Sequence, residues 1–181
     1  MFIVLEGIDG SGKSDLTKLL ADKLGGVAYA TPPEKYKELR KKVDTGSSIQ
    51  RHYEFYKGAV IEASAEISGM LAKGQTVVCD RYWLSTLVYH RAGGMVLDGS
   101  DFFNLVQPNL TIFLLVSPEI QVARSTKRAS EGGNIDGVQS MLTNLYWQAL
   151  VDSKLPFVAI NTDDINLVQC SNIVLAATSK M

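Results

Sequence analysis

The sequence is poor in cysteine, in net charge and in long hydrophobic runs. Its 181 residues include two cysteines and carry a formal net charge of −1. Two isolated cysteines, Cys79 and Cys170, offer neither a disulfide framework nor the ligand spacing of a zinc site. A charge balance this close to neutral argues against a general nucleic-acid or membrane surface, so a binder of anions must concentrate its cations in particular loops.

Targeting and membrane signals are missing as well. No apolar stretch reaches the roughly 18–20 residues of a membrane span. Met1 leads directly into a strand-like run, without the basic region that begins a signal peptide. We therefore expect a protein of the cytoplasm, a reducing compartment in which both cysteines stay free.

What the sequence does contain is an alternation of strand-like and helix-like segments. Short apolar runs predict strands at 2–6, 27–30, 75–80, 110–116 and 157–161. Helical periodicity predicts helices at 14–24, 34–46, 49–72, 84–91, 101–106, 138–153 and 164–177, and one more that opens at Pro118. Residues 129–137 are glycine-rich and polar and predict a loop. Strands that alternate with helices predict one α/β domain over residues 1–181, with a parallel sheet covered on both faces.

A phosphate-binding motif follows the first strand. Residues 7–14 read Gly-Ile-Asp-Gly-Ser-Gly-Lys-Ser and match G-x-x-x-x-G-K-[ST]. Glycines allow a tight turn whose N–H groups face inward, and the helix that follows adds its own unpaired N–H groups and dipole. The motif predicts that ATP binds at Gly7, Asp9, Gly10, Ser11, Gly12, Lys13 and Ser14. Lys13 would bridge the β- and γ-phosphates, and the Ser14 hydroxyl would ligate Mg²⁺.

Several motifs in this order resemble the thymidylate kinase family. They are residues 5–14, Asp-Arg-Tyr-Trp-Leu-Ser-Thr at 80–86, Pro-Asn-Leu at 108–110 and Ser-Pro-Glu at 117–119. The resemblance implies a three-layer α/β/α P-loop NTPase fold with a five-stranded parallel sheet and a short lid at about 124–137. The middle section, at 31–33, 55–56 and 80–83, is most similar to the mitochondrial UMP–CMP kinase-like branch.

Carried over residue by residue, the resemblance implies roles for several side chains. Asp9 would approach the sugar and phosphate of the acceptor, and Arg81 would grip the acceptor phosphate. Asp80 would hold Mg²⁺ through water. Ser11 stands where some members have an arginine that others supply from the lid, so the expected lid cations are Arg124, Lys127 and Arg128. Phe55 or Tyr56 would form an aromatic platform under the acceptor base.

Three departures from the family pattern leave the acceptor open. Asp15 replaces a threonine after the P-loop serine. Residues 31–33 read Thr-Pro-Pro in place of Arg-Glu-Pro, which removes an acceptor-binding arginine that Lys35 or Arg40 could replace. Val60 stands at the position where members of the family carry an arginine that recognises thymine. The resemblance still implies dTMP as the default acceptor, and these departures make UMP, CMP and dUMP its rivals.

The favoured function is transfer of the γ-phosphate of ATP to a pyrimidine nucleoside monophosphate. Two alternatives remain open: a nucleoside kinase that uses Glu6 as a base, and a nucleotide-binding module without catalysis. The resemblance further implies a homodimer, for which the helix at 49–72 could provide the interface. No ligand cluster accompanies His52 or His90, so neither is assigned any chemistry.

Overall fold

The computed structural model describes residues 1–126 and 135–179, and no side chains at 125–126 and 135–137. Most of the expected lid, with Lys127 and Arg128, lies outside the described residues. Within them, five strands form one sheet in the order β2-β3-β1-β4-β5, and every neighbouring pair is parallel. The strands are β1 (Phe2–Gly7), β2 (Val27–Ala30), β3 (Val77–Asp80), β4 (Leu110–Leu115) and β5 (Phe157–Asn161). The predicted five-stranded parallel sheet is confirmed.

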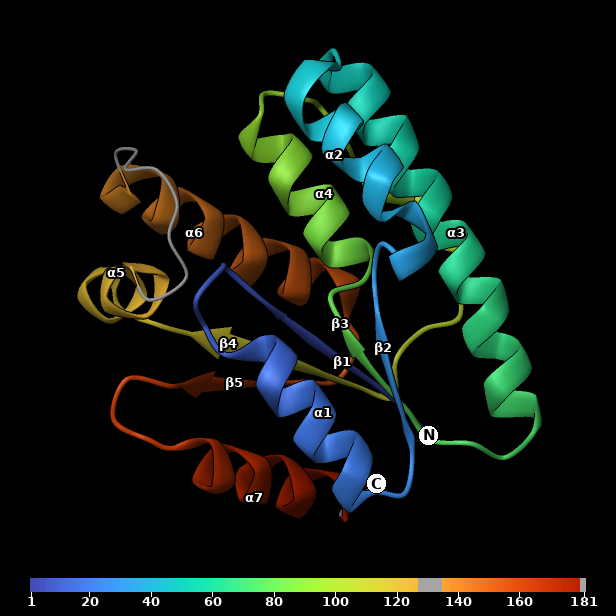
Figure 1. The fold of residues 1–181 in the computed structure, drawn as a ribbon, viewed down its shortest axis with the longest axis vertical. Helices are drawn as coiled ribbons and strands as arrows, with labels where there is room; N and C mark the ends of the chain where they lie inside the picture. Colours follow the sequence, from blue (N-terminus) through green and yellow to red (C-terminus); the bar gives the residue numbers. More distant parts are fainter. Residues whose placement is uncertain (127–134, 180–181) are drawn as a thin grey trace.

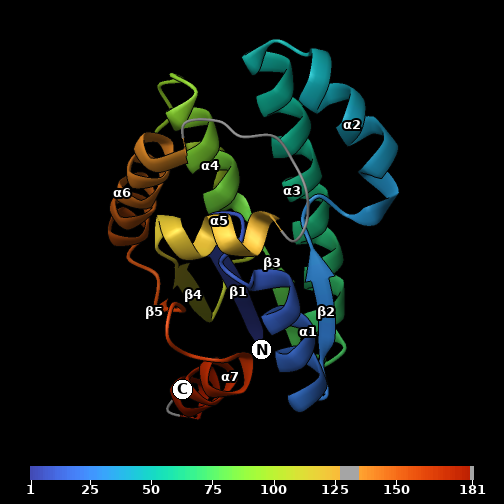
Figure 2. The same ribbon diagram turned by 60° about the vertical axis from the view of Figure 1, so that its left-hand side comes forward.

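Helices cover both faces of this sheet (Figures 1 and 2). They are α1 (Lys13–Lys23), α2 (Lys37–Gly46), α3 (Ile49–Ala72), α4 (Trp83–Ala92), α5 (Pro118–Thr126), α6 (Ile135–Ser153) and α7 (Leu167–Thr178), with short 3₁₀ turns at Glu34–Tyr36 and Ser100–Phe102. Helices α1 and α7 contribute to the apolar cluster on one face, and α3, α4 and α6 to the cluster on the other. The arrangement is the predicted three-layer α/β/α fold.

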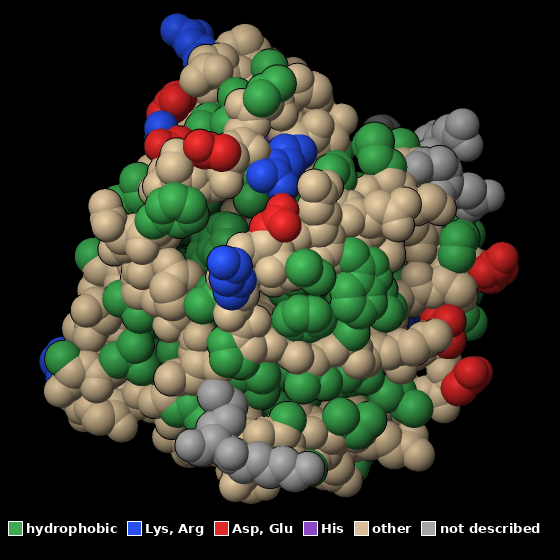
Figure 3. All heavy atoms as spheres, turned by 180° about the vertical axis from the view of Figure 1, so that it is seen from behind, with side chains coloured by type: hydrophobic (Ala, Val, Ile, Leu, Met, Phe, Trp, Pro, Cys, Tyr) green, Lys and Arg blue, Asp and Glu red, His purple; other side chains and the backbone are tan. Residues whose placement is uncertain are grey.

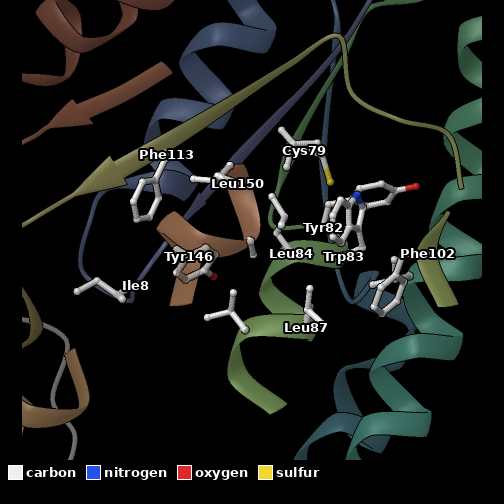
Figure 4. Packing of buried hydrophobic residues seen from close by; sticks show 14 of the residues in the cluster. Ile8, Cys79, Tyr82, Trp83, Leu84, Leu87, Phe102, Phe113, Tyr146 and Leu150 are labelled. Atoms are coloured by element: carbon white, nitrogen blue, oxygen red, sulfur yellow. The ribbon is translucent and has the colours of Figure 1, made fainter. Parts of the chain in front are cut away.

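The alternation of side chains along β1 explains why both faces are covered. Phe2 and Val4 belong to the cluster under α3, α4 and α6, whereas Ile3 and Leu5 belong to the cluster under α1 and α7. Successive strand residues point to opposite faces, so an unbroken apolar strand needs helices on both sides. Figure 4 shows the first cluster, in which side chains from β4, α4 and α6 pack around Tyr146.

Four local expectations were wrong. The helix expected at 101–106 is a single 3₁₀ turn at Ser100–Phe102, and the helix expected from 138 already begins at Ile135. The last helix begins at Leu167 rather than at 164, because Asn166 and Gln169 form a reciprocal capping box. The helical periodicity of residues 49–72 also predicts Val60, Ile61 and Ile67 on the buried face of that helix. Val60 and Ile67 are buried there, but Ile61 is exposed.

The surface opposite to the view of Figure 1 is partly apolar. Hydrophobic side chains gather over the middle of this face, with charged side chains scattered around them (Figure 3). Large exposed apolar residues of the molecule include Ile61, Phe103, Met141, Trp147 and Val151. Among the described residues, no helix combines the length and apolar character needed to cross a membrane.

Strand register determines where the functional residues meet. Leu5 of β1 lies opposite Asp80, the last residue of β3. The loop that follows β1 and the residues that follow β3 therefore leave the sheet side by side, at its carboxyl edge. This edge is where open parallel α/β sheets bind their ligands.

Candidate active site

The loop between β1 and α1 has the backbone of a phosphate cradle. Gly7 has φ +142°, and a Cβ atom there would stand 2.5 Å from the carbonyl oxygen of Leu114 on β4. Gly12, at the N-cap of α1, has φ +92°. Both positions favour glycine because their φ angles are positive. Gly7 also leaves no room for a Cβ atom. The loop thus feeds directly into the N-terminus of α1, whose free N–H groups favour an anion.

Lys13 is folded back into this loop. Its side chain is buried, and Nζ donates to the carbonyl oxygen of Ile8 at 2.6 Å and to Ser11 Oγ at 3.4 Å. Burial, followed by repulsion from Arg81, lowers the pKa of Lys13 to about 7. A buried ammonium is stabilised by an incoming anion, so the loop is suited to a phosphate ligand.

Ser14 and Asp80 meet across the sheet edge, as the sequence predicted for a metal pair. Ser14 Oγ donates to Asp80 Oδ2 at 2.5 Å, while Asp80 Oδ1 is buried without a hydrogen-bond partner. Hydroxyl and carboxylate oxygens suit Mg²⁺, which usually completes its shell with water and substrate phosphates. The described part of the chain has no cluster of three or more His, Cys, Asp or Glu side chains that could hold a metal. These residues fit Mg²⁺.

Arg81 is the cation at the centre of the site. Its backbone has φ +65°, and its guanidinium donates to Asp9 Oδ1 at 2.6 Å, to the Gly7 carbonyl oxygen at 3.0 Å and to Ser85 Oγ at 3.0 Å. Burial acts to raise the pKa of Asp9, but attraction to Arg81 and Lys13 outweighs it and holds this pKa below its ordinary value. The sequence expected both residues at the acceptor phosphate, and the structure brings them together.

Glu6 lies beneath Arg81 and is fully buried. Its carboxylate accepts hydrogen bonds from the backbone N–H groups of Tyr82 and Ser85, at 2.9 and 3.3 Å, and from Ser85 Oγ at 2.5 Å. Burial raises the pKa of Glu6 to about 6. The carboxylate orders the segment after β3, and it faces the protein interior rather than a cavity.

A cavity of about 580 Å³ opens on one side of the phosphate loop. Its walls come from the loop, from the start of α1 and from the connection between β5 and α7. Asp15 lines this cavity from the first turn of α1, where the helix dipole favours an acidic side chain. The cavity reaches the same loop that would hold a triphosphate.

Arg124 closes one wall of this larger cavity. It donates to both oxygens of Thr162, at 2.9 Å to Oγ1 and 2.7 Å to the carbonyl, and its Nη1 lies 3.5 Å from the Gly10 carbonyl oxygen. Gln121, one turn earlier in α5, donates to the Asp9 carbonyl oxygen at 2.9 Å. The sequence identified Arg124 but missed Gln121 and Thr162, which carry no motif of their own.

A second cavity, of about 230 Å³, lies on the other side of the loop. It is lined by Asp9, Thr31, Pro32, Arg40, Asp44, His52, Tyr56, Arg81, Tyr82, Ser85, Thr86, Tyr89 and His90. Asp9 lines both cavities. The two cavities therefore meet at Asp9 and the phosphate loop, and Arg81 lines the smaller one.

The structure shows which of the residues that the sequence left as equal candidates for acceptor binding line the smaller cavity. Tyr56 lines the smaller cavity, whereas Phe55 is absent from its lining and packs edge-on against Tyr36. Arg40 lines the cavity, with its guanidinium 5.9 Å from the Tyr56 ring centre. Lys35 instead forms ion pairs with glutamates of α3 and does not line the cavity.

Four further lining residues had no sequence signal. Asp44 and His52 come from α2 and α3, and Tyr89 and His90 come from α4. His52 and His90 are separated by 38 residues, yet their rings share a hydrogen bond of 2.8 Å. Nothing in the sequence indicated this contact, which arises because three helices converge on this cavity.

Together, this fold and this site define a P-loop phosphotransferase whose phosphate loop lies between two cavities. The family model for thymidylate kinase matches residues 5–163. A probable thymidylate kinase of Methanococcus aeolicus is 34% identical over 173 residues, which cover 90% of this chain and 88% of that protein. A thymidylate kinase of a Synechococcus species is 33% identical over 141 residues, 69% of each chain.

The chain belongs to the thymidylate kinase family, and it is a kinase of that family. The fold is also that of a solved thymidylate kinase from Candida albicans, with a TM-score of 0.78 and 19% identity over 99% of this chain and 91% of the other.

Proposed function

We propose that this protein transfers the γ-phosphate of ATP to a pyrimidine nucleoside monophosphate, with dTMP as the preferred acceptor. The observation that carries the proposal is the pair of cavities that share Asp9 on either side of the phosphate loop. Phosphoryl transfer requires two anionic ligands to meet end to end with cations around the transferred group. Lys13 of the phosphate loop and Arg81 of the smaller cavity would supply these cations.

The larger cavity would take ATP. Its triphosphate would lie in the loop formed by Gly7, Asp9, Gly10, Ser11, Gly12, Lys13 and Ser14. Ser14 and Asp80 would hold Mg²⁺, which neutralises phosphate charge when bound. Arg124 would line the donor site, and Arg124 with Arg128 would add positive charge at the transferred group. The proposal for Arg128 rests on the family resemblance and on its place in the expected lid.

The smaller cavity would take the acceptor. Arg81 would face the acceptor phosphate, Asp9 would lie beside its sugar, and Tyr56 would support its base. Arg40 would replace the arginine that Thr31–Pro33 lacks. No general base is needed, because an acceptor phosphate is already ionised at neutral pH. Phe55 keeps at most an indirect part, as packing for Tyr56.

The choice of dTMP rests on the relatives, several of which are thymidylate kinases. The closer similarity to the mitochondrial UMP–CMP kinase-like branch has no support among them and remains a sequence-based hypothesis. UMP, CMP and dUMP are therefore tested beside dTMP.

The environment of Glu6 argues against a nucleoside kinase. A base for a 5′-hydroxyl must reach into the acceptor cavity, but both Glu6 oxygens accept hydrogen bonds from the segment after β3. Glu6 is also absent from the lining of the cavity. The pairing of Arg81 with Asp9 beside the phosphate loop supports a site for an acceptor phosphate. It therefore favours a nucleoside monophosphate kinase over a non-catalytic nucleotide-binding module.

A coupled assay for ADP tests the proposal. ATP and Mg²⁺ are supplied with dTMP, dUMP, UMP, CMP, AMP or thymidine, and we expect the highest kcat/KM with dTMP. Lys13→Ala should lower turnover by at least about 10²–10³-fold. ADP release with thymidine but not with dTMP would favour the nucleoside kinase, and tight ATP binding without turnover on any acceptor would favour the module.

We also propose that residues 1–181 form a single domain that works as a homodimer in the cytoplasm. The two apolar clusters on opposite faces of one sheet support a single domain. Ile49 and Ile61, exposed on α3, support an interface there. Free, buried Cys79 and Cys170 suit a reducing compartment. Light scattering after size-exclusion chromatography measures the oligomeric state, and a monomer at micromolar concentration contradicts the dimer.

A further inference from the structure

Helix α5 holds the main chain of the phosphate loop from outside. Gln121 Nε2 donates to the carbonyl oxygen of Asp9 at 2.9 Å. Arg124 Nη1 reaches the next carbonyl oxygen, that of Gly10, at 3.5 Å, whereas its two shorter hydrogen bonds go to Thr162. Of these two contacts with the loop, Gln121 therefore makes the stronger one.

The start of α5 is itself fixed to its neighbours. The N–H group of Ser117, which precedes the helix, donates to Asp163 Oδ1 at 2.8 Å. Gln139 of α6 donates to the carbonyl oxygen of Val116 at 2.7 Å. Gln121 thus ties the phosphate loop to an element that is anchored both to the segment after β5 and to α6.

The peptide between Asp9 and Gly10 needs such a tie because of its residue types. A peptide unit is planar and trans, so its C=O and N–H groups point in opposite directions. Gly10 has φ +82°, and glycine adopts positive and negative φ about equally, so this peptide can turn over at little cost. Gln121 binds one orientation, in which the Asp9 oxygen faces α5 and the Gly10 N–H group points away from it.

The amide of Gln121 is distinguished by this donated hydrogen bond and not by its packing. Its Oε1 atom is buried and has no hydrogen-bond partner in the described part of the chain. Burying an acceptor in this way costs stability. An apolar side chain of similar size would avoid the cost, but it could not donate to Asp9.

We infer that Gln121 is a positioning residue of the phosphate loop, which orients the Asp9–Gly10 peptide so that the Gly10 N–H group donates to a phosphate in the larger cavity. The inference rests on the proposed function, since it takes that cavity as the donor site. Gly10 lines the cavity. Positive φ angles at Gly10 and Gly12, two residues apart, are typical of the nests of main-chain N–H groups that bind anions.

Steady-state kinetics test the inference with Gln121→Met, which keeps the length of the side chain but cannot donate a hydrogen bond. We expect kcat/KM for ATP to fall about tenfold, as for the loss of one hydrogen bond to a charged group. The KM for dTMP should change by less than about twofold, because the smaller cavity does not depend on this peptide N–H group. A general loss of structure would not separate the two substrates.

Gln107→Met is the matched control. Gln107 Nε2 also donates to main-chain carbonyl oxygens, those of Phe102 and Leu105, at 3.1 and 3.0 Å. Its Oε1 atom is likewise buried without a hydrogen-bond partner among the described residues, and Gln107 lines neither cavity. This variant should keep the wild-type kcat/KM for ATP.

NMR observes the Gly10 amide without any turnover. Labelling aspartate with ¹³C at its carbonyl carbon and glycine with ¹⁵N selects Asp-Gly pairs, which occur at residues 9–10, 98–99 and 136–137. We expect ADP with Mg²⁺ to move the Gly10 amide proton downfield in the wild type, because it gains a hydrogen bond to phosphate, and to move it much less in Gln121→Met. Gly99, which lines neither cavity, should stay in place in both proteins.

Either of two results would overturn the inference: an unchanged kcat/KM for ATP in Gln121→Met, or a Gly10 signal that ADP moves equally in both proteins or in neither. Should Gln121→Met fold poorly, Gln121→Glu, which has the shape of glutamine but no donor at neutral pH, takes its place in both tests. Absence of turnover by the wild type on every acceptor would instead refute the proposed function, and the NMR comparison would still decide whether Gln121 orients the Gly10 amide.

Discussion

At the scale of single residues, Arg81 shows how backbone and side chain are used together. A left-handed conformation costs a non-glycine residue about 1–3 kcal/mol and persists only where the surroundings enforce it. Here the Arg81 N–H donates to the Leu5 carbonyl oxygen at 2.9 Å, and its own carbonyl oxygen accepts from Thr31 Oγ1 at 3.0 Å. The turned backbone ends the ladder of β3 and directs the guanidinium to Asp9 and the loop.

Arg81→Lys should lower kcat/KM for the acceptor about 10²–10³-fold, because an ammonium cannot reproduce the planar set of donors that Asp9, Gly7 and Ser85 share. Binding of ATP should change little. Steady-state kinetics with each substrate varied separately measures both effects. Arg51→Lys, on the exposed surface of α3, is the matched control, and an equal loss in both variants would contradict the role given to Arg81.

Glu6 gives a residue-scale prediction about pH. Burial raises its folded-state pKa from the ordinary 4.5 to about 6. The folded protein therefore holds the proton more tightly, and this contribution to stability is full below about pH 4.5 and is lost as pH rises through 6. Relative to Glu6→Gln, the wild type should lose up to about 2 kcal/mol of unfolding free energy between pH 4.5 and 7. Urea titrations at the two pH values measure this, and parallel changes in both proteins would disprove it.

At the scale of elements, α2 delivers two cavity residues, Arg40 and Asp44, but buries none of its own side chains. The turn that precedes it is anchored to α3 by polar contacts. Lys35 pairs with Glu62 and Glu66, the Tyr36 hydroxyl donates to Glu62, and the Tyr29 hydroxyl donates to Glu66. Exposed pairs contribute little individually, but this network sets the position of a whole helix.

The double variant Glu62→Gln with Glu66→Gln should therefore raise KM for the acceptor severalfold, with a smaller change in kcat and in KM for ATP. Glu54→Gln is the control, since Glu54 pairs with Lys57 inside α3. An unchanged acceptor KM in the double variant would show that α2 is held by its other contacts.

At the scale of the whole molecule, the phosphate loop couples ligand binding to stability. Lys13 has a folded-state pKa of about 7 against an ordinary value of 10.5, mainly because it is buried. The unfolded chain thus binds more protons between these values, so stability rises with pH from about 7 toward 10.5 and is reduced below that window. A bound triphosphate adds negative charge beside the buried ammonium and stabilises the folded state by mass action.

Lys13→Met removes this buried charge. We expect the nucleotide-free variant to melt above the wild type near pH 7, and the difference to shrink by pH 9, because the wild-type lysine is then largely neutral. Adding ATP and Mg²⁺ should raise the Tm of the wild type by several degrees and that of the variant little. Thermal melts at both pH values measure this, and a variant that melts below the wild type at every pH would contradict it.

The strands and most helices could be predicted from the sequence because their signals are local. A buried parallel strand reads as an apolar run, and a phosphate loop reads as glycines at set spacings beside a lysine. Errors arose where a cap or a turn decided the boundary, as at Asn166 and at Ser100–Phe102. Ile61 was misplaced because a periodic pattern does not say how wide the covered face of a helix is.

By itself, the sequence indicated a phosphotransferase through the loop at residues 7–14 and the proposed partners Asp80 and Arg81. It also predicted the parallel sheet that brings these residues to one edge. The tertiary structure alone decided what lines the cavity that we propose for the acceptor. Arg40, His52 and His90 lie on three different helices, and none stands in a contiguous motif. A side chain gains such a role only from neighbours that are distant in the chain, and the packing of α2, α3 and α4 brings them together.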